Sequence, residues 1–463
     1  MKQRHSTLPK LASPLLAIAL LLAACGGGGG AATEEPATPE PTDTKTEQPK
    51  TEEPAPEEKP AEPVTVEFWH AYGEGEEKVL LEEVLPKFNE QYPHITIKAT
   101  RMPTENLDQQ VITAAAGGAV PDVMRMDNTW IARMAKEGVL QPVAEVTKEG
   151  DIQPIEGFPG FEEIKAASFE GPMSTNYYNG KYYGVPLDTN TKIAIYNKEL
   201  LAEAGAAEPP KTIDELVALA RNLKAKGKFG ITIGGPDAWN MPPWFWTLGG
   251  RITDDQYTTA TGYLNSADSV KALETIVGWN DEGLLAPPIL GGQPGTWEGL
   301  RGEEGVPATY MMINEGPWFF GILGDAVKDT MIPAKMPNGP DGKSHSVIGG
   351  QDMVIFNGAK QPEAAWTFTQ FMLTEEIQVL MAVKTGAIPT IKSAANADAL
   401  KDVYYLGAYV AEMETALART PSANWNQIGD LFGKAFEKAL RKEATPQQAL
   451  DEAAAEIDKL LKE

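Results

Sequence analysis

Cysteine is nearly absent from this chain of 463 residues, which contains only Cys25. A single thiol excludes any disulfide within the chain. Histidine is scarce too, with four residues that stand far apart, and neither His-Glu-x-x-His nor Cys-x-x-Cys occurs. We therefore expect no metal centre.

Motifs of covalent and phosphate chemistry are missing as well. No Gly-x-Ser-x-Gly nucleophile elbow occurs. Gly342-Lys343-Ser344 resembles the end of a phosphate-binding loop, but Pro337 stands where its first glycine belongs. Carboxylates are plentiful, so a pair of the kind that glycosidases use stays open. The pattern favours binding over catalysis and predicts no cofactor.

Positive charge is in deficit, since the formal net charge is −25. A chain this acidic is unsuited to nucleic acid or to an anionic membrane surface. We expect neither as a partner.

The N-terminus predicts export. Residues 1–24 combine a basic start with an apolar run, Leu11–Leu22, which Pro14 interrupts and which is too short to span a bilayer. Leu22-Ala23-Ala24-Cys25 then resembles a bacterial lipobox, which predicts a lipidated, palmitate-bearing Cys25 at the outer face of the cell membrane. An ordinary signal peptide with a chance cysteine is the alternative.

Residues 25–63 predict a disordered tether. Five glycines, Gly26–Gly30, follow Cys25, and the rest is almost entirely Ala, Thr, Glu, Pro and Lys. This composition cannot bury enough apolar surface to offset the entropy of ordering. At roughly 3 Å per residue the tether reaches on the order of 100 Å.

Order begins at Val64 with alternating strands and helices. The pattern predicts strands at 64–69, 94–99 and from Pro121, each followed by a helix, and we expect Leu81, Val84, Leu85 and Phe88 on one buried helix face with a kink at Pro86. Such an order implies parallel strands with helices on both faces.

A second α/β region follows. A capping box, Thr212 to Glu215, predicts a helix that ends near Gly227. Further elements are expected as strands at 229–233, 308–313 and 349–356, and as helices at 266–280, 362–372, 374–384 and 425–461. There is no internal repeat.

Tryptophan is the most informative residue type that is present, with ten copies. Trp69, Trp130, Trp239 and Trp318 stand beside turn residues. A pyranose ring stacks its C–H face on an indole and offers its hydroxyls to polar side chains, so a cleft that mixes the two suits a sugar. Core packing is the alternative for each of them, and it is the expectation for the helical Trp279 and Trp366.

Several segments together resemble a known family. They are Val-Glu-Phe-Trp-His-Ala-Tyr (66–72), Pro-Asp-Val-Met-Arg-Met-Asp-Asn-Thr-Trp (121–130), Asn-Gly-Lys-Tyr-Tyr-Gly-Val-Pro-Leu-Asp (179–188), Asn-Glu-Gly-Pro-Trp (314–318) and Thr-Gly-Ala-Ile-Pro-Thr (385–390). The chain resembles extracellular solute-binding protein family 1, the maltose-binding-protein-like lipoproteins of carbohydrate ABC transporters.

The resemblance implies a periplasmic-binding-protein-like α/β fold. Two α/β lobes would be joined by a hinge of three crossovers, near 187–190, 349–353 and 386–388, with a ligand cleft between them. It implies an N-terminal lobe of 64–187 plus 352–386 and a C-terminal lobe of 188–351 plus 387–463. The protein would be a monomer that docks on the transmembrane subunits of a permease.

The resemblance also implies a set of ligand-binding residues in the loops and at the hinge. They are Trp69, His70, Tyr72, Asp127, Asn128, Trp130, Asp188, Asn190, Trp239, Trp244, Glu315, Trp318, Gln351 and Asp352. The first loop reads His-Ala-Tyr, whereas the best-known maltose binders have a charged loop there, which argues against maltose itself. Few cations stand in these segments, which disfavours a phosphorylated ligand unless Arg125, Arg251 or Arg301 contributes.

The sequence thus predicts a substrate-binding lipoprotein of an ABC importer that captures a sugar or oligosaccharide. One alternative is a cell-surface enzyme acting on polysaccharide, with Asp188 and Glu315 as its carboxylates. The other is a binder of a different solute, such as a polyamine, a peptide or a glycerol phosphodiester.

Overall fold

The computed structural model describes residues 62–143 and 160–462. The predicted targeting segment, the lipidation site Cys25 and all but the last two residues of the predicted tether lie outside these residues.

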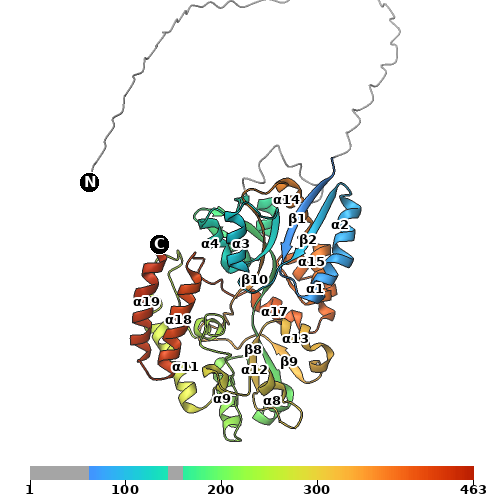
Figure 1. The fold of residues 1–463 in the computed structure, drawn as a ribbon. Coiled ribbons are helices and arrows are strands. Elements are labelled where there is room, and N and C mark those ends of the chain that lie inside the picture. The colour runs from blue at the N-terminus through green and yellow to red at the C-terminus, as the bar shows by residue number, and fades with distance from the viewer. Residues whose placement is uncertain (1–61, 144–159, 463) are drawn as a thin grey trace, which may run out of the picture. The chain divides into compact units, whose positions relative to one another are not determined.

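A six-stranded sheet has the strand order β11-β6-β10-β3-β1-β2 (Figure 1). Its strands are β1 (Val64–His70), β2 (Ile95–Arg101), β3 (Val123–Asp127), β6 (Gly184–Asn190), β10 (Gly349–Ile355) and β11 (Ile388–Pro389). β1 pairs in parallel with β2 and β3, as the strand–helix alternation predicts. β10 is antiparallel to both β3 and β6, and β11 is antiparallel to β6.

The three predicted crossover segments meet in this sheet. Residues 187–190 and 349–353 lie within β6 and β10, and residues 386–388 lead into β11. These three strands, which we call the hinge strands, are direct neighbours. Segments that are far apart in the sequence therefore come together as one element.

Two smaller sheets complete the strands. A three-stranded antiparallel sheet has the order β8-β7-β9, and a short hairpin pairs β4 with β5. Their bounds are β4 (Tyr177–Tyr178), β5 (Lys181–Tyr182), β7 (Ile193–Asn197), β8 (Met312–Glu315) and β9 (Met331–Ala334). Because β7 begins three residues after β6 ends, the chain passes directly from the hinge into the second sheet.

Helices surround both sheets. Those between β1 and β6, and from the end of β10 to residue 395, are α1 (Glu74–Val79), α2 (Leu85–Gln91), α3 (Leu107–Ala116), α4 (Ile131–Lys136), α6 (Phe161–Ala167), α7 (Glu170–Ser174), α14 (Pro362–Met372), α15 (Glu375–Thr385) and α16 (Lys392–Ala395). The others are α8 (Lys198–Ala204), α9 (Ile213–Lys224), α10 (Pro242–Thr247), α11 (Ala267–Glu282), α12 (Thr296–Arg301), α13 (Trp318–Leu323), α17 (Leu406–Met413), α18 (Trp425–Leu440) and α19 (Pro446–Leu461). Short 3-10 turns occupy Asn128–Trp130, Pro287–Leu290, Gly324–Val327 and Asp398–Asp402.

The buried apolar residues gather around the two main sheets. One set packs on the six-stranded sheet and includes Phe68, Val123 and Trp366. Another set packs on the three-stranded sheet and includes Tyr196 and Trp279. We call these regions the first and the second lobe. Both helical tryptophans are buried, which confirms the expectation of core packing.

The first helical region differs from expectation at Leu81. A π-helical turn spans Leu80–Val84, so the buried face passes through Leu80, and Leu81 is 48% exposed. Pro86 follows at the start of α2 and has no N–H to donate to the preceding turn, which explains why the regular hydrogen bonds open there. The π-helical turn lies just before Pro86, where the predicted kink stays a prediction, and the prediction for Leu81 is wrong.

The predicted strand at 229–233 is also wrong. Phe229 bridges to Tyr310 and Ile231 bridges to Leu285, so alternate residues have different partners and no continuous ladder forms. Between them, Gly230 lies against the backbone of Ala220, where an added Cβ would stand 2.3 Å from its Cα. The segment is held by its close approach to α9 instead.

The predicted C-terminal helix is two helices, α18 and α19, which run side by side (Figure 1). Lys442 between them adopts a positive φ of 60°. Thr445 then caps α19, with its side chain accepting a hydrogen bond from the Gln448 N–H. The chain therefore turns back between two amphipathic helices.

Candidate functional site

A buried ion pair lies at the hinge. Arg125 of β3 donates from Nε and Nη2 to the two carboxylate oxygens of Asp188 on β6, at 2.8 and 2.9 Å. Both side chains are almost fully buried. A bidentate guanidinium–carboxylate pair has a fixed geometry. It therefore fixes the position of the hinge carboxylate.

Tyr72 and His70 lie beneath this pair. The Arg125 guanidinium lies 4.1 Å from the centre of the Tyr72 ring, which in turn packs on His70. Burial, followed by the charges of Arg125 and Arg101, lowers the pKa of His70 to about 4. Both predicted residues are thus buried and support Arg125 from within the first lobe.

A cavity of about 540 Å³ opens beside the ion pair. Its lining residues come from both lobes and from a hinge strand. They include Glu76 and Arg125, then Asp188 and Asn190, and then Trp318 and Tyr405. This volume is within the usual range for small-molecule sites. The cavity therefore brings together three predicted ligand-binding residues, Asp188, Asn190 and Trp318.

Two of the predicted tryptophans face each other near the hinge. The ring centres of Trp239 and Trp318 are 6.2 Å apart, and both side chains are half-buried. A Cβ added at Gly349 of β10 would stand 2.8 Å from the Trp239 ring, so this indole contacts the hinge itself. The two rings come from different loops of the second lobe and form an aromatic wall.

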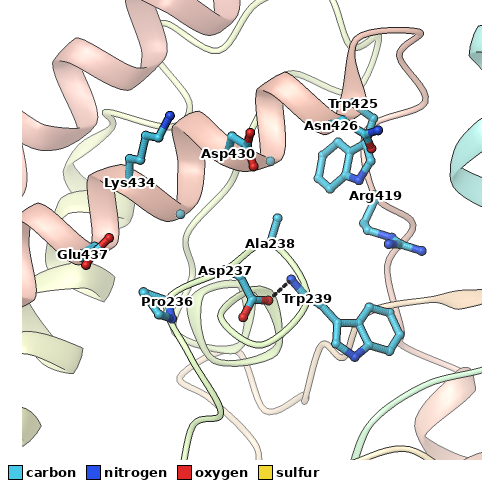
Figure 2. Close-up of a pocket in the computed structure, with 12 residues that line it drawn as sticks. Pro236, Asp237, Ala238, Trp239, Arg419, Trp425, Asn426, Asp430, Lys434 and Glu437 are labelled. Atoms are coloured by element: carbon cyan, nitrogen blue, oxygen red, sulfur yellow. Dashed lines mark hydrogen bonds between the residues drawn. The ribbon is translucent and has the colours of Figure 1, made fainter. Parts of the chain in front are cut away.

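A second cavity, of about 440 Å³, has Trp239 in its wall (Figure 2). Arg419 and Trp425 line it together with Trp239, and the carboxylate of Asp237 accepts a hydrogen bond from the Trp239 N–H at 2.8 Å. This bond fixes the loop that carries the indole. Trp239 is therefore held in place in the wall of this cavity.

The loop after β3 contributes polar groups next to these cavities. Asp127 accepts from the Thr129 N–H and, at 3.4 Å, from Gln351 of β10. Asn128 accepts from Arg419 at 2.9 Å. The loop thus connects the hinge to the second lobe, and Asp127 also has the N-cap role that is the ordinary one for such a residue.

Trp69 and Trp130 lie elsewhere. Both are half-buried and pack against the apolar cluster around Met126, and neither lines the two cavities. A role of either residue in ligand binding stays a prediction.

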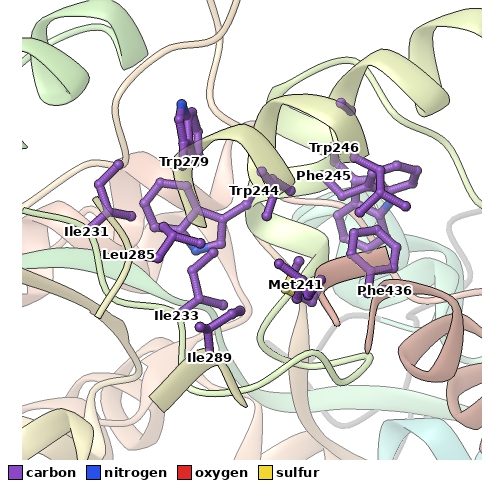
Figure 3. Packing of buried hydrophobic residues seen from close by; sticks show 14 of the residues in the cluster. Ile231, Ile233, Met241, Trp244, Phe245, Trp246, Trp279, Leu285, Ile289 and Phe436 are labelled. Carbon is purple, nitrogen blue, oxygen red and sulfur yellow. The ribbon is translucent and has the colours of Figure 1, made fainter. Parts of the chain in front are cut away.

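Trp244 is in the hydrophobic core, contrary to its predicted place in the cleft (Figure 3). It is 0% exposed and packs edge-on against Trp279 at 6.0 Å. The reason is its position in α10, a short helix whose six residues are all buried.

Asp352 does not face the cavities either. It is buried, accepts a hydrogen bond from Thr175 at 3.3 Å, and neighbours Asn176. Its neighbour Gln351 faces Asp127 instead, as expected for alternate residues of a strand. Burial raises the pKa of Asp352 to about 8.

The carboxylates proposed for an enzymatic pair are both engaged. Asp188 binds Arg125, and Glu315 accepts from the Trp297 indole N–H at 2.8 Å and from the Gly316 N–H at 3.0 Å. Each carboxylate is thereby held by partners of its own, which leaves neither placed to act as a free acid or base.

Four residues of this region were not among the predicted ligand-binding residues. Arg125 could have been found from sequence, since a charge within the apolar strand Val123–Asp127 requires a buried partner. The sequence gives no such indication for Lys192, Arg419 or Trp425, because the residues that surround them in space come from loops that are distant in the sequence.

Two absences hold for the described residues. Across 62–143 and 160–462, no group of three or more His, Cys, Asp or Glu side chains could hold a metal ion. In the same ranges, no helix is both long and apolar enough to cross a membrane.

Comparison with known proteins gives relatives along most of the chain. A galactooligosaccharide-binding protein of Bacillus subtilis is 25% identical and covers 78% of this chain and 82% of its own length. An sn-glycerol-3-phosphate-binding periplasmic protein of Shigella dysenteriae is 24% identical and covers 86% and 92%. The structure of a cyclic alpha-maltosyl-1,6-maltose binding protein from Arthrobacter globiformis, 24% identical, superimposes with a TM-score of 0.75 over 86% of this chain and 99% of that one.

The structural likeness confirms the expected α/β fold of the periplasmic binding proteins. The model of the bacterial extracellular solute-binding proteins matches residues 83–404, which is most of the chain. This family binds solutes and is not enzymatic, as the absence of catalytic motifs led us to expect. The chain belongs to the family of bacterial extracellular solute-binding proteins.

Proposed function

We propose that this protein captures a sugar or oligosaccharide between its two lobes and delivers it to the membrane permease of an ABC importer. The observation that carries the proposal is the cavity at the hinge, lined by both lobes and by β6, with Trp318 in its wall and Trp239 against that indole. An indole face stacks on a pyranose, and the Asp188 and Asn190 side chains offer partners for hydroxyls.

Capture would work through a shift between open and closed arrangements of the lobes. A ligand that contacts both lobes binds the closed arrangement more tightly and favours it by that difference alone. The hinge strands let the lobes move, and we propose the boundaries at 187/188, 351/352 and 386/387.

The anchor belongs to the same proposal. Cleavage after Ala24 would leave a lipidated Cys25 at the outer face of the membrane, with residues 25–63 as a tether. Metabolic labelling with an alkynyl palmitate, compared with a Cys25→Ser variant, tests this part by itself.

The solute class is tested by thermal unfolding of the purified protein. We expect a saccharide, such as a galactooligosaccharide, to raise the melting temperature by several degrees at 1 mM, because binding to the folded state stabilises it. Polyamines and short peptides serve as controls and should leave it unchanged. If only one of these controls raises it, the proposal of a carbohydrate ligand fails.

Glycerol phosphate is a second candidate. One relative is named as an sn-glycerol-3-phosphate binder, and cations lie near the hinge. The same screen includes it.

A further inference from the structure

Two cations flank the same indole at the candidate site. The guanidinium of Arg419 lies 5.1 Å from the centre of the Trp239 ring, and the ammonium of Lys192 lies 5.5 Å from it. Lys192 comes from the segment that follows the hinge strand β6, and Arg419 from the segment that precedes α18. The fold therefore collects positive charge around one ring.

Neither cation has a negatively charged partner in the described part of the chain. The Nζ of Lys192 donates to the amide oxygen of Asn240 at 2.5 Å, and Nη2 of Arg419 donates to the amide oxygen of Asn128 at 2.9 Å. The Nε of Arg419 is buried without any hydrogen-bond partner. Burial lowers the pKa of both groups.

Three carboxylates stand nearby, but neutral donors occupy them. Asp127 accepts from Thr129 and Gln351, and Glu315 from Trp297 and the Gly316 N–H. Asp237 accepts from the backbone of Trp239 and from Asn240. All six carboxylate oxygens thus have donors other than the two cations.

The contrast with Arg125 is informative. That arginine is buried and has its own bidentate carboxylate, Asp188, whereas Arg419 is half-buried and donates to an amide oxygen. A buried cation without a counter-ion destabilises the folded chain, since the lost hydration is not replaced. An arrangement that leaves two such cations around the Trp239 ring is stable only at a cost, which a bound anion would offset.

Building on the proposed function, we infer that the solute carries an anionic group, which Arg419 and Lys192 bind beside the Trp239 ring. The ligand class is a saccharide or polyol that bears a carboxylate or a phosphate. Arg419 lines the cavity of about 440 Å³, its buried Nε–H has no hydrogen-bond partner, and a planar guanidinium suits either anion.

The test compares two saccharides that differ in charge and adds a polyol phosphate. Calorimetric titrations use a galacturonic acid trisaccharide, its uncharged methyl ester, and sn-glycerol 3-phosphate, each with the purified wild-type protein. We expect the acid or the phosphate to bind at least 10-fold more tightly than the methyl ester, with affinity falling as salt is added.

Three variants locate the effect. Arg419→Gln and Lys192→Met should each weaken binding of the anion about 10- to 100-fold, as expected for a charge-assisted hydrogen bond, and change binding of the ester less than about 3-fold. Lys271→Gln removes one positive charge from the exposed face of α11 and should change neither. Thermal unfolding without ligand checks the fold, and we expect Arg419→Gln to be no less stable than the wild type.

The outcomes separate the two proposals. The inference is overturned if the acid and the ester bind equally well and if Arg419→Gln and Lys192→Met leave both affinities unchanged. The sugar proposal would then still stand. Binding of glycerol phosphate alone, lost in Arg419→Gln, supports the inference and overturns the carbohydrate ligand. If none of the three ligands binds while a polyamine does, both proposals fail.

Discussion

At the scale of single residues, the site depends on charges held out of water. Arg125 and Asp188 satisfy each other, whereas Arg419 and Lys192 have only amide oxygens. The two kinds of charge therefore differ in function. The paired Arg125 and Asp188 support the hinge, whereas the unpaired Arg419 and Lys192 are available to a ligand.

Removing one partner of the buried pair should be costly. We expect Asp188→Asn to lower the free energy of unfolding by about 3 kcal/mol, because Arg125 is then buried without a counter-charge. Urea unfolding measures the change. Asp255→Asn is the matched control, since its ion pair with Arg251 is exposed and should contribute less than about 1 kcal/mol. Equal effects of the two substitutions would contradict a structural role for the hinge pair.

Asp352 should make stability depend on pH. Its pKa is raised to about 8 in the folded protein, above the ordinary value of 3.8. The folded state then holds the proton more tightly, so this stabilisation is complete below about pH 4 and is lost as the pH rises toward 8.

The corresponding variant is Asp352→Asn, which resembles the protonated acid at every pH. Relative to the wild type, its urea midpoint should be similar at pH 4 and increasingly higher from pH 5 to pH 8. Because Glu412, whose pKa is raised to about 7, titrates in both proteins, its contribution cancels in the comparison. A difference between the two proteins that stays constant from pH 5 to pH 8 would show that Asp352 is already ionised in the folded protein.

At the scale of elements, the hinge strands are packed so closely that a larger side chain cannot be accommodated at Gly350. Gly350 of β10 has φ of +136°, and a Cβ there would stand 2.4 Å from the Asp188 carbonyl oxygen and 2.8 Å from the Thr189 Cα. These are backbone atoms of β6, which cannot rotate away.

Substitution at this glycine should therefore disturb the hinge. We expect Gly350→Ala to lower the free energy of unfolding by about 2 kcal/mol and to weaken solute binding. Gly278→Ala is the control, since Gly278 lies exposed within α11 with open space around it, and alanine there should stabilise by about 0.7 kcal/mol. Urea unfolding of both variants shows whether each substitution raises or lowers the free energy of unfolding. A neutral or stabilising Gly350→Ala would mean that the hinge strands separate easily.

Sequence patterns correctly predicted the helices whose ends are set by residues close in the sequence. The Thr212 capping box starts α9 as expected, and the helix expected after the second strand is α3, Leu107–Ala116. The strand at 229–233 could not be excluded from sequence, because its failure depends on contacts with Tyr310, Leu285 and Ala220 far along the chain.

In the candidate site, too, sequence patterns predicted the place of some residues correctly and failed where tertiary packing decides. Asp188, Asn190 and Trp318 stand beside turns and strand ends and do line the cavity. Trp244 has similar neighbours in sequence, yet tertiary packing of α10 buries it. Arg419 approaches Trp239 only because α18 folds back on the second lobe, and nothing in its own segment indicates this.

At the scale of the whole molecule, the central claim is that one solute contacts both lobes and the hinge together. Such a ligand should reduce the local opening of segments that are distant in sequence but share the site, which amide hydrogen exchange detects directly.

The deciding measurement is hydrogen–deuterium exchange of the full chain with and without a saturating saccharide. We expect the ligand to slow exchange in peptides that cover 72–76, 125–130, 186–192, 236–240 and 316–318. Exchange in α11, which contributes no residue to the proposed site, should not change and serves as the internal control. Protection confined to one lobe, or absent from 186–192, would contradict a ligand that binds between the lobes at the hinge.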